Sequence, residues 1–323
     1  MNCRICSNRE GNRTHLAREM MFGLRDEFEY IECALCGTVQ IAEIPDLEKY
    51  YPPNYLSFDG ESPVGRSPMH RLAARFVGEY YLNGGGWLGK LLTRVEPRFG
   101  NHFPESMRRV HLGLTPDSRI LDFGCGAGRL LQSLHFFGFR NLTGADAFIA
   151  GDIEYPTGVK IQKRPLSELE GPFDLIMLHH SFEHLPNPAA ELRELKRLMS
   201  PEGHCLIRIP VAAFAWETYG TNWVQMDPPR HLYLFTEKAM QKLADEAGLE
   251  ITDVRYDSTG FQFWGSEQYK RDIPLVPEGG DGRFAPSSIF TKKQLDDWEA
   301  KAVELNAERL GDAACFYLKR IKE

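Results

Sequence analysis

The chain has 323 residues, a formal net charge of −7 and seven cysteines. This length predicts two domains, or one large domain with an appendage, and 42% hydrophobic residues against 26% charged ones is a globular balance. The acidic excess argues against an extended basic face for nucleic acid. No run reaches the roughly 18 apolar residues of a membrane span, and the N-terminus lacks the apolar core of a secretory signal. We therefore expect a cytoplasmic protein whose cysteines are metal ligands, buried side chains or reactive thiols rather than disulfides.

Four of the cysteines form two Cys-x-x-Cys pairs near the N-terminus: Cys3, Cys6, Cys33 and Cys36. This spacing lets the thiolates of each pair face one tetrahedral metal ion. The loop between the pairs is longer than the common spacing of roughly 15–20 residues, but it has room for short strands over 29–32 and 37–42. Unrelated surface pairs or redox-active dithiols are the alternatives, yet so small a segment needs a cross-link such as a bound metal ion to fold. Four thiolates leave no open ligand position, so the sequence predicts a structural zinc ribbon over residues 1–43.

The next stretch, residues 44–105, is rich in tyrosine, proline and glycine. Helical periodicity stands out only over 69–81. We expect a linker and a helical cover for the domain that follows, which would run over residues 106–323.

A strand, a glycine turn and a helix follow one another from residue 119. Arg119–Phe123 is a short apolar run, Gly124-Cys125-Gly126-Ala127-Gly128 is the turn, and 129–137 has apolar residues at helical spacing before Gly138. Such a unit offers a close backbone approach and unpaired N–H groups to a nucleotide. Cys125 would line this turn, whereas the other two cysteines, Cys205 and Cys315, are expected to pack in strands.

Two carboxylates refine this prediction. Asp122 stands two positions before the first glycine of the turn, where a carboxylate suits an ammonium group better than a pyrophosphate. Asp146, followed by Ala147, ends the next strand, where it can accept both ribose hydroxyls. An amino acid joined to a nucleoside without phosphates fits this pair, and that ligand is S-adenosylmethionine (SAM). The alternative is a dinucleotide, but the turn lacks the G-x-G-x-x-G spacing.

The run Ile120-Leu121-Asp122-Phe123-Gly124-Cys125-Gly126-Ala127-Gly128 resembles the first motif of class I SAM-dependent methyltransferases. Later elements follow that family's order over about 119–257. They are a fourth strand at 173–180, a helix that begins at Pro188, a turn at 200–203 with a fifth strand at 204–210, a helix at 237–247 and a sixth strand at 250–257. The resemblance implies a Rossmann-like α/β sheet, parallel with one antiparallel strand, with helices on both faces.

Two inserts interrupt this pattern, at 211–235 and 258–290. A helix over about 291–310 and a last strand over 313–321 complete the expected sheet. The first insert contains Asp227-Pro228-Pro229, which resembles the D-P-P-Y motif of amino-group DNA methyltransferases only in its letters. It follows the fifth strand rather than the fourth and continues with Arg230, so we discard that reading.

Histidines follow the fourth and fifth strands, at the edge where ligands of open α/β sheets bind. His179 and His180 are assigned to the cofactor, which their imidazoles would flank, although catalysis is an alternative for them. His231 and His184 are the candidates for the base that removes the proton of the acceptor. For His184 the alternative is a hydrogen bond within its own turn.

A narrower similarity is to sugar methyltransferases, notably the deoxysugar C-methyltransferases, which combine a four-cysteine ribbon, a tyrosine-rich segment and a SAM domain. That resemblance implies a catalytic role for His184, a partial match at Arg230–Phe235 and a SAM-closing role for Tyr55. The chain departs from it at Pro229-Arg230, where the family has His-Glu, and it lacks the family's long C-terminal domain. O-methylation of a sugar or another hydroxylated small molecule is therefore favoured over C-methylation.

Two rivals remain at this point. The first is an RNA methyltransferase that recognises its substrate through the ribbon, with a local basic patch around Arg66, Arg71 and Arg75. The second is a non-catalytic SAM-fold module, against which the complete first motif argues. The oligomeric state and the identity of the acceptor stay open.

Overall fold

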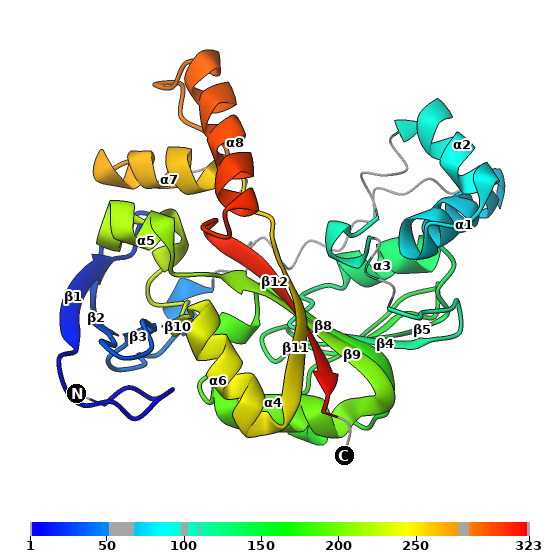
Figure 1. The fold of residues 1–323 in the computed structure, drawn as a ribbon, viewed down its shortest axis with the longest axis horizontal. Coiled ribbons are helices and arrows are strands. Elements are labelled where there is room, and N and C mark those ends of the chain that lie inside the picture. Colours follow the sequence, from blue (N-terminus) through cyan, green and yellow to red (C-terminus); the bar gives the residue numbers. More distant parts are fainter. Residues whose placement is uncertain are drawn as a thin grey trace. The chain divides into compact units, whose positions relative to one another are not determined.

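The computed structural model describes residues 2–51, 68–97, 103–108, 110, 112–276 and 284–321 (Figure 1). It divides into two compact units. The first contains residues 1–56, 180–193 and 207–321, and the second contains 57–179, 194–206 and 322–323. Helix α4 (Pro188–Leu198) and strand β9 (Met199–Pro210) each contribute residues to both units. Among the described residues, no helix is long and apolar enough to span a membrane.

The second unit is built on a mostly parallel sheet with the strand order β9-β8-β4-β5-β7-β6. Strand β4 (Arg119–Phe123) pairs in parallel with β5 (Asn141–Ala145) and with β8 (Phe173–His179). Strand β5 also pairs in parallel with β7 (Lys160–Gln162), and the short β6 (Ile153–Glu154) is antiparallel to β7. The predicted strands at 119–123, 141–146 and 173–180 are therefore confirmed. Their central residues are buried because a parallel sheet is covered on both faces.

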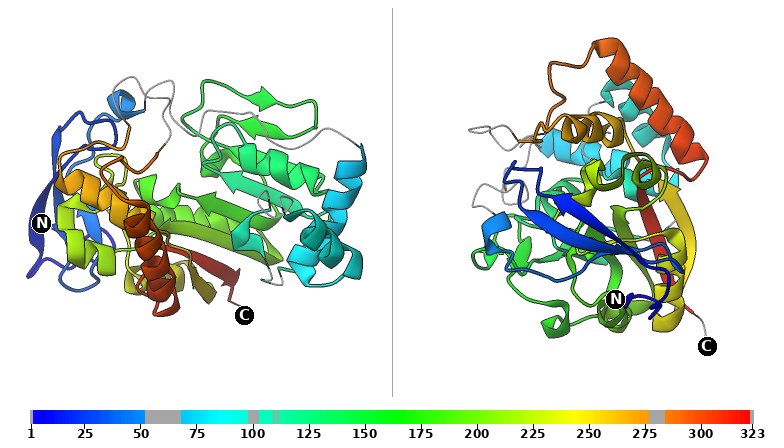
Figure 2. Two further views of the ribbon diagram at one scale, coloured as in Figure 1. Left: turned by 90° about the horizontal axis from the view of Figure 1, so that it is seen from above. Right: turned by 90° about the vertical axis from the view of Figure 1, so that its left-hand side faces the viewer.

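Three helices belong to the second unit: α1 (Pro68–Asn83), α2 (Trp87–Val95) and α3 (Arg129–Phe136). Helix α1 confirms the periodicity over 69–81 and contacts both α2 and α3. Figure 2 shows α1 and α2, in cyan, side by side. Gly89 allows this approach, because a Cβ there would collide with the main chain at Phe76. The sequence did not indicate α2 as a separate helix. The described residues of this unit also include the 3-10 turns Glu105–Met107 and Leu166–Glu168.

The first unit has a four-stranded sheet with the order β1-β2-β3-β10. Its strands are β1 (Arg13–Arg18), β2 (Glu27–Glu32), β3 (Val39–Ile41) and β10 (Tyr233–Leu234), and the neighbouring pairs are antiparallel. The strands expected over 29–32 and 37–42 are present as β2 and β3, which flank the second cysteine pair, whereas β1 was not predicted. The fourth strand comes from the first insert of the SAM domain. The N-terminal sheet is thus completed by a strand that lies almost 200 residues further along the chain.

The rest of the first unit contains the end of β9, the antiparallel pair β11 (Leu249–Tyr256) and β12 (Ala313–Arg320), and four helices. The helices are α5 (Phe214–Tyr219), α6 (Glu237–Ala247), α7 (Phe261–Lys270) and α8 (Lys292–Ala307). Helix α6 begins as predicted, since the Thr236 side chain accepts a hydrogen bond from Ala239 N, and it ends at Gly248 in the left-handed conformation. In this unit the strand order is β11-β12-β9.

Two expectations about local structure were wrong or incomplete. Residues 200–203 form no turn, because β9 is continuous from Met199 to Pro210. Gly203 packs closely there, and a Cβ would stand 2.8 Å from the Phe173 carbonyl oxygen. Neither insert is a plain loop: the first holds α5 and the 3-10 turns Gly220–Asn222 and Val224–Met226, and the second holds α7. The domain limits 1–43, 44–105 and 106–323 stay a prediction.

Candidate functional site

The glycine turn after β4 is held in the conformation that the sequence predicted. Gly124, Gly126 and Gly128 have φ values of +74°, +52° and +76°, which side chains rarely adopt. Gly124 N donates to Ala145 O at 2.7 Å, so the turn is tied to the end of β5. Gly128 is also the residue at which α3 begins, and a Cβ there would stand 2.4 Å from Ile161 Cδ1. The turn therefore presents main chain rather than side chains to a ligand.

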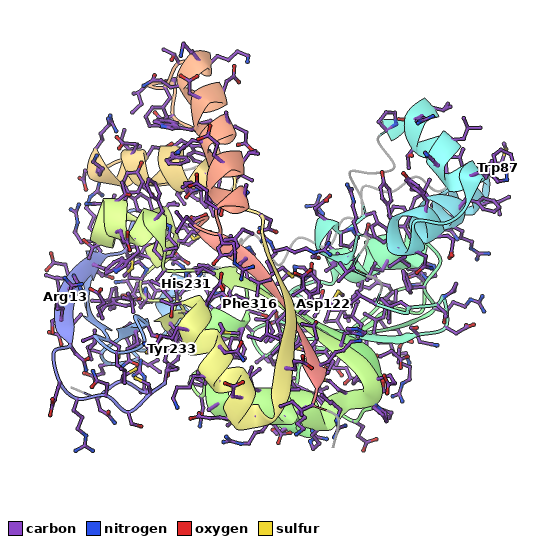
Figure 3. The ribbon with its side chains drawn as sticks, in the orientation of Figure 1. Arg13, Trp87, Asp122, His231, Tyr233 and Phe316 are labelled. Atoms are coloured by element: carbon purple, nitrogen blue, oxygen red, sulfur yellow. The ribbon has the colours of Figure 1, made fainter. Side chains whose placement is uncertain are left out.

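Asp122, labelled in Figure 3, lies near the carboxyl end of β4, and Asp146 directly follows the neighbouring parallel strand β5. Asp122 is buried, and burial together with the charge of Asp146 raises its pKa to about 8. A bound cation would stabilise the ionised carboxylate of Asp122 and so lower this pKa again. The ammonium group of SAM is such a cation. Asp146 accepts hydrogen bonds from Gly126 N and Phe148 N, both at 2.8 Å. Its carboxylate is thereby oriented at the strand end, where the predicted ribose contact requires it.

The neighbours of these carboxylates have distinct environments. Burial raises the pKa of Cys125 well above its usual value, so this thiol lines the turn without being a nucleophile. Ala147 is exposed, and Phe148, which the sequence reading passed over, exposes 52% of its surface directly after Asp146. An exposed aromatic ring beside the carboxylate that is predicted to bind ribose suits an adenine face.

His179 and His180 are adjacent in the chain but differ in their surroundings. His179 is the last residue of β8 in the second unit. His180 belongs to the first unit and adopts a positive φ of 51°. Its Nε2 forms a hydrogen bond with Nη1 of Arg208, and its Nδ1 lies 3.4 Å from Glu183 Oε1. The cofactor role of both histidines stays a prediction, and Tyr55 lies outside the described residues.

A cavity of about 250 Å³ lies entirely within the first unit. Its polar lining comes from the segments after β8, β9 and β11, and its main members are His180, His184, Arg208, Asp227, His231 and Asp257. Apolar side chains line the rest, among them Met21, Val224, Phe261, Leu275 and Phe284. A concave, partly open site that combines apolar walls with a few convergent polar groups is the usual form of a small-molecule site.

The two predicted bases meet in this cavity. The ring centroids of His184 and His231 are 4.9 Å apart. His184 Nδ1 lies 2.7 Å from Arg230 O, and His231 Nδ1 lies 2.7 Å from Gln225 O. A carbonyl oxygen only accepts, so both Nδ1 atoms carry the proton and both Nε2 atoms are left with a lone pair. The main chain therefore fixes the tautomer in which each ring can take up a proton at Nε2.

Two carboxylates lie near the unprotonated ring nitrogen, Nε2, of His231. Its Nε2 lies 3.8 Å from Asp227 Oδ2 and 3.9 Å from Glu183 Oε1. Glu183 is fully buried, and neither of its oxygens has a hydrogen-bond partner among the described residues. Burial alone would raise the pKa of Glu183, but contact with His180 and the charges of His184 and His231 outweigh it and lower the pKa to about 2. Conversely, burial and the neighbouring His231 lower the pKa of His184. Neither carboxylate was assigned a role from the sequence, although Asp227 stands in the discarded Asp-Pro-Pro run and Glu183 stands next to a predicted base.

Glu183, His184 and His231 also have the side-chain types of a metal site, with candidate ligand atoms within 4.8 Å of one another. Bonds of roughly 2.0–2.1 Å at tetrahedral angles would separate two ligand atoms by only about 3.4 Å. The 3.9 Å between His231 Nε2 and Glu183 Oε1 exceeds this. The arrangement fits proton transfer, with carboxylates that stabilise an imidazolium, better than it fits a bound metal ion.

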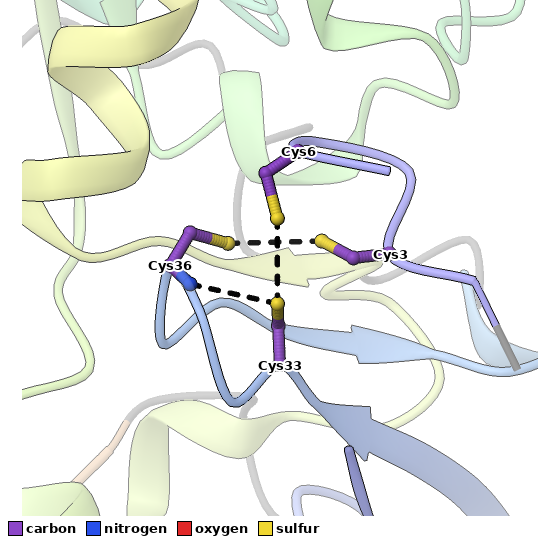
Figure 4. Close-up of side chains that lie close together, drawn as sticks. All are labelled: Cys3, Cys6, Cys33 and Cys36. Atoms are coloured by element: carbon purple, nitrogen blue, oxygen red, sulfur yellow. Dashed lines mark hydrogen bonds between the residues drawn. The ribbon is translucent and has the colours of Figure 1, made fainter. Parts of the chain in front are cut away.

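The four N-terminal cysteines are brought together as predicted, with all four sulfurs within 4.8 Å of one another (Figure 4). The distance is 3.6 Å for the Cys3–Cys36 pair of sulfurs and 3.4 Å for the Cys6–Cys33 pair. Zn–S bonds of 2.3 Å at tetrahedral angles would place neighbouring sulfurs about 3.8 Å apart. Backbone N–H groups also point at sulfur, from Ile5 to Cys3 and from Cys36 to Cys33. Donors and geometry therefore both fit a tetrahedral metal ion.

Comparisons with known proteins identify a methyltransferase domain in this chain. A family model described as a methyltransferase domain matches residues 93–254, half of the chain. The ubiquinone biosynthesis O-methyltransferase of Pseudomonas aeruginosa (strain UCBPP-PA14) is 28% identical over 155 residues, which are 42% of this chain and 66% of that protein. The namesake from Maricaulis maris (strain MCS10) is 32% identical over 151 residues, 42% of this chain and 57% of that protein. The chain thus spans less than two thirds of the length of either relative.

Solved structures with a similar fold include mycolic acid cyclopropane synthase CmaA1 in complex with S-adenosylhomocysteine (SAH) and CTAB. Its TM-score is 0.42 at 15% identity, over 81% of this chain and all of that one. For the cyclopropane synthase MmaA2 from Mycobacterium tuberculosis the TM-score is 0.41 at 14% identity, over 67% of this chain and 85% of that one.

The fold and the glycine turn thus define a class I methyltransferase. The chain belongs to the methyltransferase domain family, which confirms the predicted fold and the predicted class of enzyme, a SAM-dependent methyltransferase.

Proposed function

We propose that this protein transfers the methyl group of SAM to a hydroxyl group of a small acceptor bound in the first-unit cavity. The observation that carries the proposal is the fixed tautomer of His231, which lines that cavity and whose Nε2 lies 3.8 and 3.9 Å from two carboxylate oxygens. The O-methyltransferase names of the curated relatives support an oxygen acceptor.

In this mechanism Asp122 binds the ammonium group of SAM, Asp146 orients the ribose, and the glycine turn admits the cofactor to the main chain. SAM supplies the methyl group on a positively charged sulfur. His231 Nε2 would accept the proton of the acceptor hydroxyl as that oxygen takes the methyl group from SAM, which would leave as SAH. Glu183 and Asp227 stabilise the imidazolium, as negative charges do at about 4 Å in a partly buried site. His184 is the second candidate for the base.

We further propose a carbohydrate-like acceptor. The polar wall of the cavity offers the carboxylates of Asp227 and Asp257 and the guanidinium of Arg208, and Asp257 accepts from Arg208 Nε at 2.5 Å. Several fixed donors and acceptors around a small volume suit a ligand with several hydroxyl groups. The apolar wall, which includes Phe261 and Leu275, suits the C–H face of a sugar ring.

The N-terminal cysteines are proposed to hold one structural zinc ion, since four thiolates of this geometry leave no position for a substrate. The structure describes all seven cysteines, and none of them forms a disulfide. A reducing compartment favours this state, and we place the protein in the cytoplasm on that argument.

The test is a turnover screen that measures SAH release with nucleotide sugars, free glycans, phenolic hydroxyl compounds and small RNAs. We expect turnover with a hydroxylated small molecule and transfer of the methyl group to oxygen. Turnover with RNA alone, or methylation at carbon, would overturn the proposal.

A further inference from the structure

The main chain of the proposed base is held by the N-terminal sheet. The Tyr30 hydroxyl, on β2, donates a hydrogen bond of 2.8 Å to the carbonyl oxygen of His231. Tyr30 is fully buried, so water does not replace this bond. One residue further on, Ile41 N, on β3, donates to Leu232 O at 3.0 Å. Two strands of the cysteine-bearing sheet thus fix consecutive carbonyl groups at the catalytic segment.

Arg230 makes a second connection to the same sheet. Its side chain is fully buried, and its guanidinium donates to Glu19 Oε1 at 2.8 Å and to both oxygens of Asp227. A third contact, of 3.2 Å, goes to Tyr50 O. Glu19, in the loop between β1 and β2, also accepts hydrogen bonds from Phe22 N and Leu24 N. The loop is therefore rigidly attached to Arg230.

These contacts converge on the two candidate bases. The carbonyl group of Arg230 is the acceptor for His184 Nδ1, and Asp227, which Arg230 orients, lies 3.8 Å from His231 Nε2. Leu232 N, in turn, donates to Glu183 O at 2.9 Å. A buried network of charges contributes little net stability but specifies one geometry when all its members are satisfied.

The same loop reaches the acceptor cavity directly. Met21 is one of its lining residues and is buried. Leu275 N donates to Met20 O and Val276 N to Met21 O, which joins the loop to the segment that supplies another wall residue, Leu275. The β1–β2 hairpin, residues 13–32, therefore contacts both the catalytic segment and the cavity.

We propose that the β1–β2 hairpin is a positioning element of the acceptor site, in which Tyr30 and Glu19 hold residues 230–232 so that His184 and His231 keep Nε2 toward the cavity. The ribbon would then serve the reaction by setting the geometry of the base. This inference rests on the proposed function for its catalytic meaning, although the geometry it claims can be measured without an acceptor.

The experiment is ¹⁵N NMR of the full chain, with the metal it contains when purified, after labelling of its histidines. The His231 signals are assigned by their loss in His231→Gln. We expect Tyr30→Phe to mix the two tautomers, so that the Nδ1 and Nε2 signals of His231 move toward each other. Glu19→Gln should likewise move the Nδ1 and Nε2 signals of His184 toward each other, because it weakens the contact that holds the Arg230 side chain.

Tyr256→Phe is the matched control, because it removes a hydroxyl that donates to Glu237 Oε1 at 2.6 Å, outside the cavity. It should leave both sets of signals unchanged. Unchanged His231 and His184 signals in both Tyr30→Phe and Glu19→Gln would overturn the inference. If Tyr30→Phe does not fold, Glu19→Gln decides alone.

A kinetic readout separates this inference from the proposed function. With an acceptor from the turnover screen, Tyr30→Phe should lower kcat about 10-fold while the KM for SAM stays the same, since misplacing a base affects the transition state and not cofactor binding. If the wild-type protein methylates no hydroxyl compound, the proposed function fails, whereas the NMR result still decides whether the hairpin positions the histidines.

Discussion

His184 Nδ1 donates a hydrogen bond of 2.7 Å to the main-chain carbonyl oxygen of Arg230. This bond joins the turn after β8 to the loop after β9, two segments that the sequence separates by more than forty residues. It also settles the tautomer of His184, because a carbonyl group cannot donate. The two candidate bases are thus parts of one hydrogen-bonded assembly.

His231→Gln should abolish most turnover while it leaves SAM binding nearly unchanged. Glutamine keeps the size and polarity of the side chain but cannot take up a proton at neutral pH, and loss of a general base costs about 10²- to 10⁴-fold in rate. Turnover and SAM affinity are measured by SAH release and calorimetry. His70→Gln, at an exposed position on α1, is the control and should behave as wild type. Full turnover in His231→Gln would leave His184 as the base.

Glu183→Gln should shift the acid limb of the kcat/KM profile to lower pH, because the charge of Glu183 favours the protonated form of a neighbouring imidazole, as it does where it acts to raise the pKa of His184. A pH–rate profile with the acceptor from the screen measures this shift. Glu237→Gln, on α6, removes a carboxylate outside the cavity and should leave the profile in place. An identical profile in both variants would show that Glu183 does not act on the base.

Asp122→Asn should weaken SAM binding about 10- to 100-fold, since a hydrogen bond between charged groups contributes about 1.5–3 kcal/mol. Asparagine has the same shape as aspartate, so the glycine turn is expected to stay intact. Isothermal titration with SAM and with SAH measures the loss, which should be similar for both because they share the ammonium group. Binding equal to wild type would place the ammonium group elsewhere.

The same substitution should change how stability depends on pH. The pKa of Asp122 is raised from 3.8 to about 8 in the folded protein without ligand. Its contribution to stability is therefore fully present below about pH 3.8 and is lost as the pH rises toward 8. Asp122→Asn removes this dependence, so without SAM it should gain melting temperature over wild type as the pH is raised from 6 to 8.5. Thermal unfolding at these two pH values tests this prediction. A difference in melting temperature between wild type and variant that does not change with pH would contradict the raised pKa of Asp122.

Cys33→Ser should lose the zinc ion and, with it, the stability of the N-terminal sheet. Wild type should contain about one zinc per chain by metal analysis, and the variant should contain close to none because three thiolates bind far more weakly. Cys205→Ser, a buried cysteine on β9 away from the cluster, is the control for loss of a thiol. Full zinc content in Cys33→Ser would refute the four-cysteine site.

Much of the second unit was predictable from local sequence. The apolar run 119–123, the turn with three glycines at positive φ and the amphipathic helix after it are signals within about twenty neighbouring residues, and each is present in the structure. The caps of α6 at Thr236 and Gly248 were readable for the same reason. Helix α2 was missed because it follows α1 after three glycines, which sequence rules read as a loop.

The acceptor site was predictable only in part. His184 and His231 were chosen for their places after strands, and both line the cavity. In the sequence, Arg230 served to discard the D-P-P-Y reading. Its structural role depends on its contact with Glu19, which is more than two hundred residues away in the chain. Glu183 carried no sequence signal of its own, because a glutamate at a helix start is ordinary and only its complete burial makes it unusual.

Short-range chemistry was enough to predict a SAM-binding turn, two carboxylates for its ligand and a four-cysteine metal cluster. Each depends on spacing within one segment, or on two pairs that a metal ion would join. Tertiary structure alone decided which segments the N-terminal sheet contacts, since β10 and Arg230 lie about two hundred residues further along the chain. The reason is physical: the pairing of distant strands and the burial of charges are properties of the folded chain, and no local pattern records which partner a strand edge or a guanidinium will find.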